Sequence, residues 1–256
     1  NVKLVHFIGK DIVYFHLLFW PAMLKTFDIN NLEEVFVHGF LTIEGKKMSK
    51  SKGNFILADN ALKFANPDYY RYYFCSKLNT DISDIDFSVD DFIQKINSDL
   101  VGKFINIGSR TQNFLVKLNN SEIASGNNKK SESFKLNYQE IIDLVDKKEY
   151  SKALKNIMAI ADKTNAYVSN QEPWKKAKNG EEDKCIEICS EALNVFKDLT
   201  ILLQPFIPSI TEKIFELLNK ETLNYDDLNK DNLNKIQKFQ PFITRLEKND
   251  FDGILD

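Results

Sequence analysis

Apolar and polar positions alternate in two different patterns along this chain, one in the N-terminal zone and one in the rest. In the N-terminal zone, compact apolar runs at 2–9 and 34–39 flank a segment over 11–24 whose apolar residues recur at helical spacing. Two buried strands joined by a helix at this separation form a βαβ unit with parallel strands. The N-terminal zone is therefore predicted to be α/β.

A hairpin and a connecting region follow this unit. Residues 40–43 alternate apolar with polar side chains and meet Glu44-Gly45, which predicts a β-hairpin. Short helices are predicted over 58–65 and 67–74, and the polar stretch 81–87 is predicted to be extended.

From Phe92 onward, apolar residues recur at helical spacing almost to the end of the chain, which predicts a helical bundle. The expected helices cover 89–118, 134–146, 149–169, 181–203 and 207–219, with a weaker one near 230–238. Loops rich in Asn, Ser and Lys are expected at 119–132, 170–180 and 220–229.

The predicted fold class is thus an α/β fragment followed by an all-α helical bundle. We place the boundaries at 1–57 for the α/β part, 58–100 for the connector, 101–238 for the bundle and 239–256 for a C-terminal tail. Because the chain starts abruptly with an apolar run and without Met, we expect it to be a fragment of a longer protein.

Composition narrows the classes of function. The 256 residues include only 9 Gly and 6 Pro, which argues against turn-dense all-β and collagen-like folds. A net charge of −3 disfavours histone-like binding to nucleic acid, and no DNA partner is expected. The apolar run 12–24 is too short to span a bilayer and contains His16 and Pro21, so no membrane partner is expected.

Three cysteines in the chain fit a reducing, cytoplasmic location rather than a disulfide scaffold. Cys185 and Cys189 lie four residues apart on one helical face, with no further His or Cys nearby to complete a metal site. We interpret them as structural thiols, and no metal site is predicted in this chain.

The strongest chemical signal is the run Lys47-Met48-Ser49-Lys50-Ser51-Lys52-Gly53-Asn54 after the hairpin. Lysine is a compact point charge on a flexible stem, so three lysines among small polar residues can converge on a polyphosphate. Serine hydroxyls and free backbone N–H groups add hydrogen-bond donors. An exposed charged turn is the alternative interpretation of such a run.

Residues 47–51 read KMSKS, which is the second signature of class I aminoacyl-tRNA synthetases. The stretch 6–16, HFIGKDIVYFH, together with Phe19-Trp20-Pro21-Ala22 and Phe36-Val37-His38-Gly39, resembles the methionyl-tRNA synthetase family, and the resemblance covers nearly the whole chain. It implies the end of a Rossmann-type catalytic domain followed by an anticodon-binding bundle. The implied activity is methionine–tRNA ligation through methionyl-adenylate, with methionine, ATP and tRNA(Met) as partners.

The resemblance also assigns an ATP site and its catalytic groups. Lys50, with Lys47, would stabilise charge as the methionine carboxylate attacks the α-phosphate of ATP, with Mg²⁺ sharing this task. The implied ATP-binding residues are Gly9, Lys10, Asp11, Lys47, Ser49, Lys50 and Lys52. Read from the sequence alone, Asp11 could also act as a helix cap.

Two further sites follow from the resemblance. Ile12 and His16 are four apart on one helix face and, with Phe15, would line the methionine side-chain pocket. In the bundle, Asn106 and Arg110 would read base edges of the anticodon, and the Pro173-Trp174 pair would supply a ring for base stacking. Without the resemblance, His16 would be interpreted as a packing residue. Trp174 could equally be a packing residue at a bundle edge or, between Pro173 and Lys175-Lys176, a partly exposed one.

Parts of the family pattern are absent. The first class I signature and the first half of the nucleotide fold are missing, so we expect the chain alone to be inactive in methionine activation. Zinc is expected only in the insertion that belongs to that missing region. The alternatives are a leucyl- or isoleucyl-type synthetase and a tRNA-binding module without catalytic activity.

Overall fold

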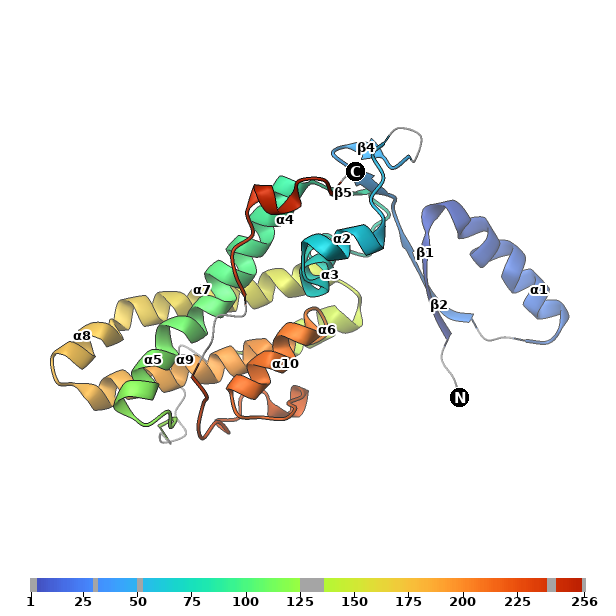
Figure 1. Ribbon diagram of the computed structural model, residues 1–256. Coiled ribbons are helices and arrows are strands. Elements are labelled where there is room, and N and C mark those ends of the chain that lie inside the picture. The colour runs from blue at the N-terminus through green and yellow to red at the C-terminus, as the bar shows by residue number, and fades with distance from the viewer. Residues whose placement is uncertain (1–3, 30–31, 50–52, 125–135, 239–242, 255–256) are drawn as a thin grey trace.

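The computed structural model describes residues 4–29, 32–49, 53–124, 136–238 and 243–254. Figure 1 shows an N-terminal β–helix–β unit at one end, a connector above the centre and a helical bundle at the other end. The predicted fold class, an α/β part followed by an all-α bundle, is confirmed.

The N-terminal unit is the predicted parallel pair of strands. Strand β1 (Leu4–Gly9) pairs in parallel with β2 (Leu32–His38), and Gly9 lies opposite His38 at the carboxyl end. The crossover between them is composite rather than one regular helix. It consists of a 3₁₀ turn at Lys10–Ile12, a π-helical segment at Phe15–Phe19 and helix α1 (Trp20–Thr26).

The predicted hairpin is also present and is attached to the connector. Strands β3 (Leu41–Ile43) and β4 (Lys46–Lys47) are antiparallel, and Glu44 and Gly45 turn between them with φ of 49° and 71°. Two consecutive positive φ angles are the geometry of a tight hairpin turn. The extended stretch of the connector supplies β5 (Ile85–Phe87), which pairs in parallel with β3.

The connector and the bundle share one hydrophobic core. Connector helices α2 (Ala58–Phe64) and α3 (Pro67–Cys75) lead through β5 to a long rod, which consists of α4 (Val89–Lys95), a π-helical segment (Ile96–Ile105) and α5 (Asn106–Leu118). The core is built of fully buried side chains from both parts, including Tyr72, Tyr73, Phe92, Phe104 and Phe196.

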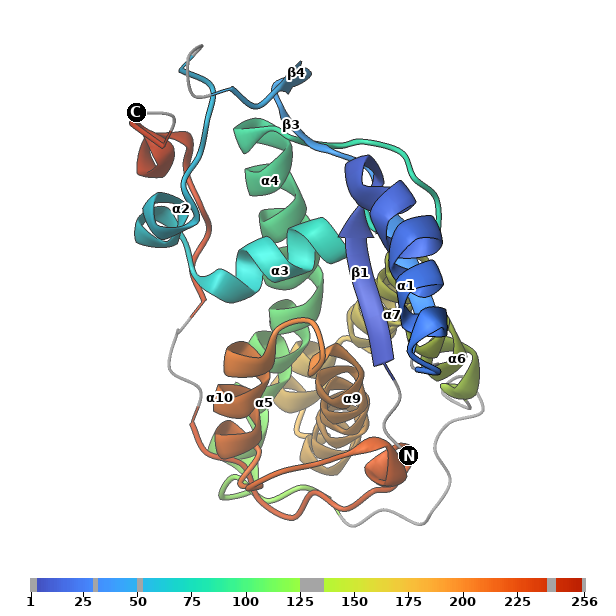
Figure 2. The same ribbon diagram turned by 90° about the vertical axis from the view of Figure 1, so that its right-hand side faces the viewer.

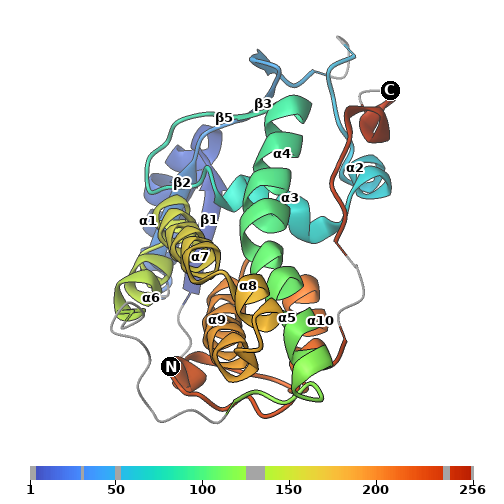
Figure 3. The same ribbon diagram turned by 90° about the vertical axis from the view of Figure 1, so that its left-hand side faces the viewer.

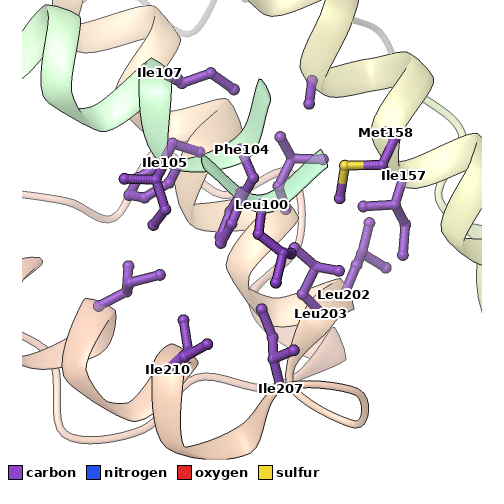
Figure 4. Close-up of a cluster of buried hydrophobic side chains, with 14 of the residues drawn as sticks. Leu100, Phe104, Ile105, Ile107, Ile157, Met158, Leu202, Leu203, Ile207 and Ile210 are labelled. Carbon is purple, nitrogen blue, oxygen red and sulfur yellow. The ribbon is translucent and has the colours of Figure 1, made fainter. Parts of the chain in front are cut away.

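The remaining helices complete the bundle (Figures 2 and 3). They are α6 (Gln139–Asp146), α7 (Tyr150–Gln171), α8 (Pro173–Lys178), α9 (Glu182–Leu203) and α10 (Pro208–Leu217). Helices α7 and α9 pack against the rod, and α6, α8 and α10 pack mainly on these two. Figure 4 shows how Leu100 and Phe104 of the rod meet Leu202 and Leu203 at the end of α9. Both Cys185 and Cys189 of α9 are buried and unpaired, as predicted.

Two sequence predictions in the bundle are wrong. Residues 170–180, predicted to be a loop, contain helix α8, which begins with Pro173 directly after Glu172 in a left-handed conformation (φ 48°). Residues 230–238, predicted to be a weak helix, contain none. There the Ile236 amide donates to Ser121 and Lys235 bridges to Glu122, so contacts distant in sequence decide the backbone.

The chain after α10 is held to the bundle by a buried cation. The side chain of Lys197 is fully buried, and its Nζ donates to the carbonyl oxygens of Asp227 (2.8 Å) and Lys230. Nζ also lies 3.0 Å from Oδ1 of the equally buried Asp198. A buried ammonium needs such partners, because desolvation without them is very costly.

The last described residues return to the connector. The Asn97 side chain exchanges two hydrogen bonds of 2.8 Å with the backbone of Leu246, and buried Phe251 stacks near Phe64. The segment Lys248–Phe251 therefore lies near α2 and α4 (Figures 2 and 3). Within the described ranges, no helix is both long and apolar enough to cross a membrane.

Candidate functional site

Two of the lysines predicted to bind ATP meet near the carboxyl edge of the parallel strands. Lys10 directly follows β1, and its Nζ lies 4.8 Å from the centroid of the Phe40 ring. Lys47, at the end of the hairpin, places its Nζ 4.8 Å from the same ring. Residues separated by the whole of β2 and the hairpin thus present two cations beside one aromatic side chain. Ligands of parallel sheets bind at this edge.

A carboxylate that the sequence analysis missed organises this edge. Oδ1 of Asp84 accepts from Lys10 Nζ at 2.6 Å and from the Phe40 backbone N–H at 2.7 Å. These hydrogen bonds, from Lys10 first and Phe40 second, lower the pKa of Asp84, with the charge of Lys47 adding to the effect. Lys10 and Lys47 thus place two ammonium groups at this edge, and ammonium groups suit an anionic ligand.

Tight backbone contacts fix the geometry of the edge. A Cβ placed on Gly39 would lie 2.1 Å from the Ser83 carbonyl oxygen, so only glycine lets the end of β2 pass this close to the connector. A Cβ on Gly9 would lie 2.7 Å from Oδ1 of Asp11, so the Asp11 carboxylate folds back over Gly9. The structure shows no capping hydrogen bond from Asp11, because the N-cap of the 3₁₀ turn is Gly9.

The connector holds the hairpin in place. Oδ1 of Asp86 accepts from the Thr42 hydroxyl at 2.6 Å and from the Gly45 backbone N–H at 2.7 Å. Asp84, directly before β5, and Asp86 within it therefore anchor both the base and the turn of the hairpin. The alternation of Asp84 and Asp86 in an extended stretch was the sequence signal for this role.

One asparagine closes the two sides of the loop that carries the KMSKS sequence. Oδ1 of Asn54 accepts from the Ser49 backbone N–H at 3.1 Å, and Nδ2 of Asn54 donates to the Lys47 carbonyl at 3.0 Å. Ser49 is therefore held at the base of the loop. The other predicted groups of this loop, Lys50 and Lys52, lie outside the described residues.

The residues predicted for the methionine pocket separate into two groups. Nδ1 of His16 lies 3.2 Å from the Ile12 carbonyl oxygen. Because a carbonyl only accepts, Nδ1 carries the proton and a neutral imidazole presents Nε2 as an acceptor. Phe15 is not part of this group, since it is 62% exposed and pairs with Phe19 at 5.8 Å between ring centroids.

Two aromatic neighbours of His16 were missed by the sequence analysis. The His6 ring of β1 stacks on Trp20 at 4.9 Å and meets the His16 ring edge-on at 5.4 Å. The Trp20 ring lies 6.1 Å from His16. This cluster packs the crossover onto one face of β1, and its sequence signal was the spacing of Ile12, His16 and Trp20.

The residues predicted to contact the anticodon come together at one end of the bundle. The Arg110 guanidinium lies over the Trp174 ring at 5.6 Å, and its Nη2 donates to Ser169 Oγ at 3.1 Å. Trp174 is 40% exposed, so its ring is not sealed in the core, whereas Pro173 at the start of α8 is buried. One turn earlier on α5, Nδ2 of Asn106 donates to Oδ1 of Asn165 at 3.0 Å.

Comparison with protein families gives two matches. Residues 1–112 match the family described as "tRNA synthetases class I (M)", and residues 119–252 match the "Anticodon binding domain of methionyl tRNA ligase". Similar curated proteins include the methionine–tRNA ligase of Ralstonia nicotianae, 44% identical over 98% of this chain and 37% of its own length. That of Francisella tularensis is 43% identical over 99% of this chain and 38% of its own length.

Solved structures agree on the fold. A Mycobacterium tuberculosis methionyl-tRNA synthetase in complex with methionyl-adenylate has a TM-score of 0.79 and 24% identity, covering 94% of this chain and 49% of that one. The apo form of the same enzyme gives 0.78 and 22%, covering 95% and 50%. The chain spans well under half the length of the curated relatives that it matches. Both of its parts nevertheless match one family, so the chain belongs to the methionyl-tRNA synthetase family of class I aminoacyl-tRNA synthetases.

Proposed function

We propose that the protein carrying this chain is a methionine–tRNA ligase that activates methionine with ATP and transfers it to tRNA(Met). The curated relatives bear that name, and one structural neighbour was solved with methionyl-adenylate. Because this chain covers only 37–38% of those relatives, the complete reaction belongs to the whole protein. The chain contributes the KMSKS loop, part of the methionine pocket and the anticodon-binding bundle.

The observation that carries this proposal is the meeting of Lys10 and Lys47 at the edge of β1 and β2. In the proposed reaction the methionine carboxylate attacks the α-phosphate of ATP, the bond from that phosphorus to the bridging oxygen of the β-phosphate breaks, and pyrophosphate leaves. Negative charge increases on the phosphate oxygens during this step. Lys47 and Lys50 stabilise that charge, and Lys10, Ser49 and Lys52 bind the nucleotide. Gly9 leaves room for close approach of the nucleotide, and Asp11 accepts hydrogen bonds from its ribose or from the substrate ammonium.

Mg²⁺ is the expected companion of ATP in this reaction. It would bind the phosphate oxygens and neutralise part of their charge. Among the described residues, no group of three or more His, Cys, Asp and Glu side chains is placed to hold a metal ion.

The methionine side chain would lie against Ile12 and His16, with Phe15 at its margin. A thioether is polarizable and a weak acceptor, which suits an apolar wall with few polar groups. At the other end of the chain, Trp174 on Pro173 stacks on an anticodon base, and Asn106 and Arg110 read base edges. We further propose a cytoplasmic location, which the three unpaired cysteines support.

The test is methionine-dependent ATP–pyrophosphate exchange by the complete protein with Lys50→Ala. Removing one group that stabilises transition-state charge is expected to slow exchange by roughly 100-fold or more. Lys46→Ala is the matched control, because Lys46 is an exposed lysine of the same hairpin outside the signature, and it should keep the wild-type rate. An unchanged rate in Lys50→Ala would contradict the role of the loop. Tight tRNA binding without any exchange in the wild type would instead support the tRNA-binding module.

A further inference from the structure

Helices α5 and α7 are joined by a regular series of polar contacts near the proposed anticodon site. Each contact links two residues that are 59 positions apart in the sequence, so the offset between partners stays constant along the two helices. The pairs are Lys103 with Asp162 (2.8 Å), Asn106 with Asn165 (3.0 Å) and Arg110 with Ser169 (3.1 Å). The first lies at the end of the π-helical segment and the last lies beside Trp174.

The middle pair contains an amide that has only one possible orientation. Nδ2 of Asn165 donates to the Lys103 carbonyl at 2.8 Å and to the Ala161 carbonyl at 3.0 Å. Backbone carbonyls only accept, so the nitrogen must be on that side. Turning the Asn165 amide over would place its oxygen against two carbonyl oxygens and lose both hydrogen bonds.

The fixed orientation of Asn165 determines that of Asn106. Oδ1 of Asn165 can only accept, so Asn106 must present Nδ2 to it. Oδ1 of Asn106 is then the amide atom that Asn165 does not use. Within the described residues this oxygen has no hydrogen-bond partner, and it is not among the polar atoms sealed from solvent.

We propose that Asn165 is a positioning residue that sets the hydrogen-bond pattern with which the site reads an anticodon base, an inference that rests on the proposed function. With Asn106 held as an acceptor and Arg110 as a donor, the site is complementary to a base edge with an amino group next to a ring acceptor. Cytosine and adenine have such edges, whereas uracil and guanine present a keto oxygen to Asn106. The CAU anticodon that pairs with the methionine codon contains both amino bases.

The experiment measures binding of this 256-residue chain to RNA hairpins with a CAU loop and to hairpins in which cytosine becomes uracil or adenine becomes guanine. For the keto substitution that weakens wild-type binding most, Asn165→Ala is expected to reduce the discrimination by about tenfold, because the Asn106 amide can then turn over. Asn170→Ala is the matched control. It removes an exposed asparagine of the same helix and should keep the wild-type discrimination.

A double variant separates positioning from a general structural effect. If Asn165 acts through Asn106, adding Asn165→Ala to Asn106→Ala changes the discrimination no further, whereas independent structural damage would add to it. Discrimination that survives intact in Asn165→Ala overturns the inference and leaves the proposed function standing. Equal binding of all hairpins by the wild type would overturn the proposed anticodon reading itself.

A measurement on the wild type covers the case in which Asn165→Ala does not fold. Hydrogen exchange of the side-chain amides, followed by NMR, should show both Asn165 protons protected relative to those of exposed Asn170. Exchange of the Asn165 protons at the rate of Asn170 would mean that the amide is not held, and the inference would be wrong.

Discussion

The two ends of this chain bury their apolar side chains to very different degrees. In the connector and bundle, Tyr72, Phe104 and Phe196 are fully buried in one core. In the N-terminal unit, none of the described residues from Lys10 to Thr26 is buried, and large apolar side chains such as Tyr14 are up to 72% exposed. Local sequence pattern forms the βαβ unit, but only the bundle closes a core with the residues described. The chemistry of activation is thus proposed for the part whose packing is incomplete.

The largest expected effect tests this difference in packing. Phe104→Ala removes a ring that packs 4.9 Å from Phe196 in the bundle core, and it is expected to cost about 3–5 kcal/mol of the free energy of unfolding. Phe15→Ala makes the same change in the N-terminal unit at a ring that is 62% exposed, and is expected to change the value by less than about 0.5 kcal/mol. Urea unfolding followed by circular dichroism measures both. Similar losses in the two variants would show that the N-terminal unit is as well packed as the bundle.

A smaller effect distinguishes the two tryptophans of the chain. Trp174→Ala should weaken binding of a CAU hairpin by roughly tenfold, because stacking on an aromatic ring contributes about 1–3 kcal/mol per base. Its effect on stability should be small, since the ring is 40% exposed. Trp20→Ala, which removes a ring stacked on His6 in the N-terminal unit, should leave hairpin binding unchanged. Fluorescence anisotropy with labelled RNA measures both, and a loss shared by the two variants would remove Trp174 from the interface.

The smallest effect concerns the link between hairpin and connector. The pKa of Asp84 is lowered from 3.8, chiefly by its hydrogen bond from Lys10, so the carboxylate stabilises the folded state at pH values above 3.8. That contribution disappears as the pH falls through the lowered pKa. Protection of the Phe40 amide, corrected for intrinsic exchange, should therefore drop on acidification in the wild type and be low at every pH in Asp84→Ala, which removes the acceptor. Asp59→Ala, at an exposed position on α2, is the control and should follow the wild type.

Sequence pattern predicted the regular elements well where apolar periodicity was strong. The runs at 2–9 and 34–39 became β1 and β2, and the segment 89–118 became one continuous rod. Helix α8 was missed because Lys, Asn and Gly around Pro173 resemble a loop, although proline at the first position of a helix is a recognised start signal. The prediction of a helix near 230–238 was wrong because the Ile236 backbone N–H donates to the Ser121 carbonyl, and a local sequence pattern cannot indicate a contact so distant in the sequence.

Residues of the candidate site could be predicted from the sequence only where they belong to a motif of the family. The positions of Lys10, Lys47, Arg110 and Trp174 followed from the resemblance, but their partners did not. Asp84 lies in a polar stretch that was predicted to be extended but not assigned to the site, and Asn165 lies in a helix whose surface is rich in polar residues. Both act through hydrogen bonds to residues more than 40 positions away, and such pairs arise only from tertiary structure.

The buried Lys197 sets a limit on how far this chain can be shortened. A version that ended after α10 would keep every long helix of the bundle, yet it would remove the two carbonyl oxygens of Asp227 and Lys230 that receive the ammonium. The same cut would leave a charge inside an otherwise apolar interior with Asp198 as its main counterpart. The smallest stable RNA-reading piece of this protein therefore has to extend beyond Lys230, through a stretch whose helical structure is a single 3₁₀ turn at Tyr225–Asp227.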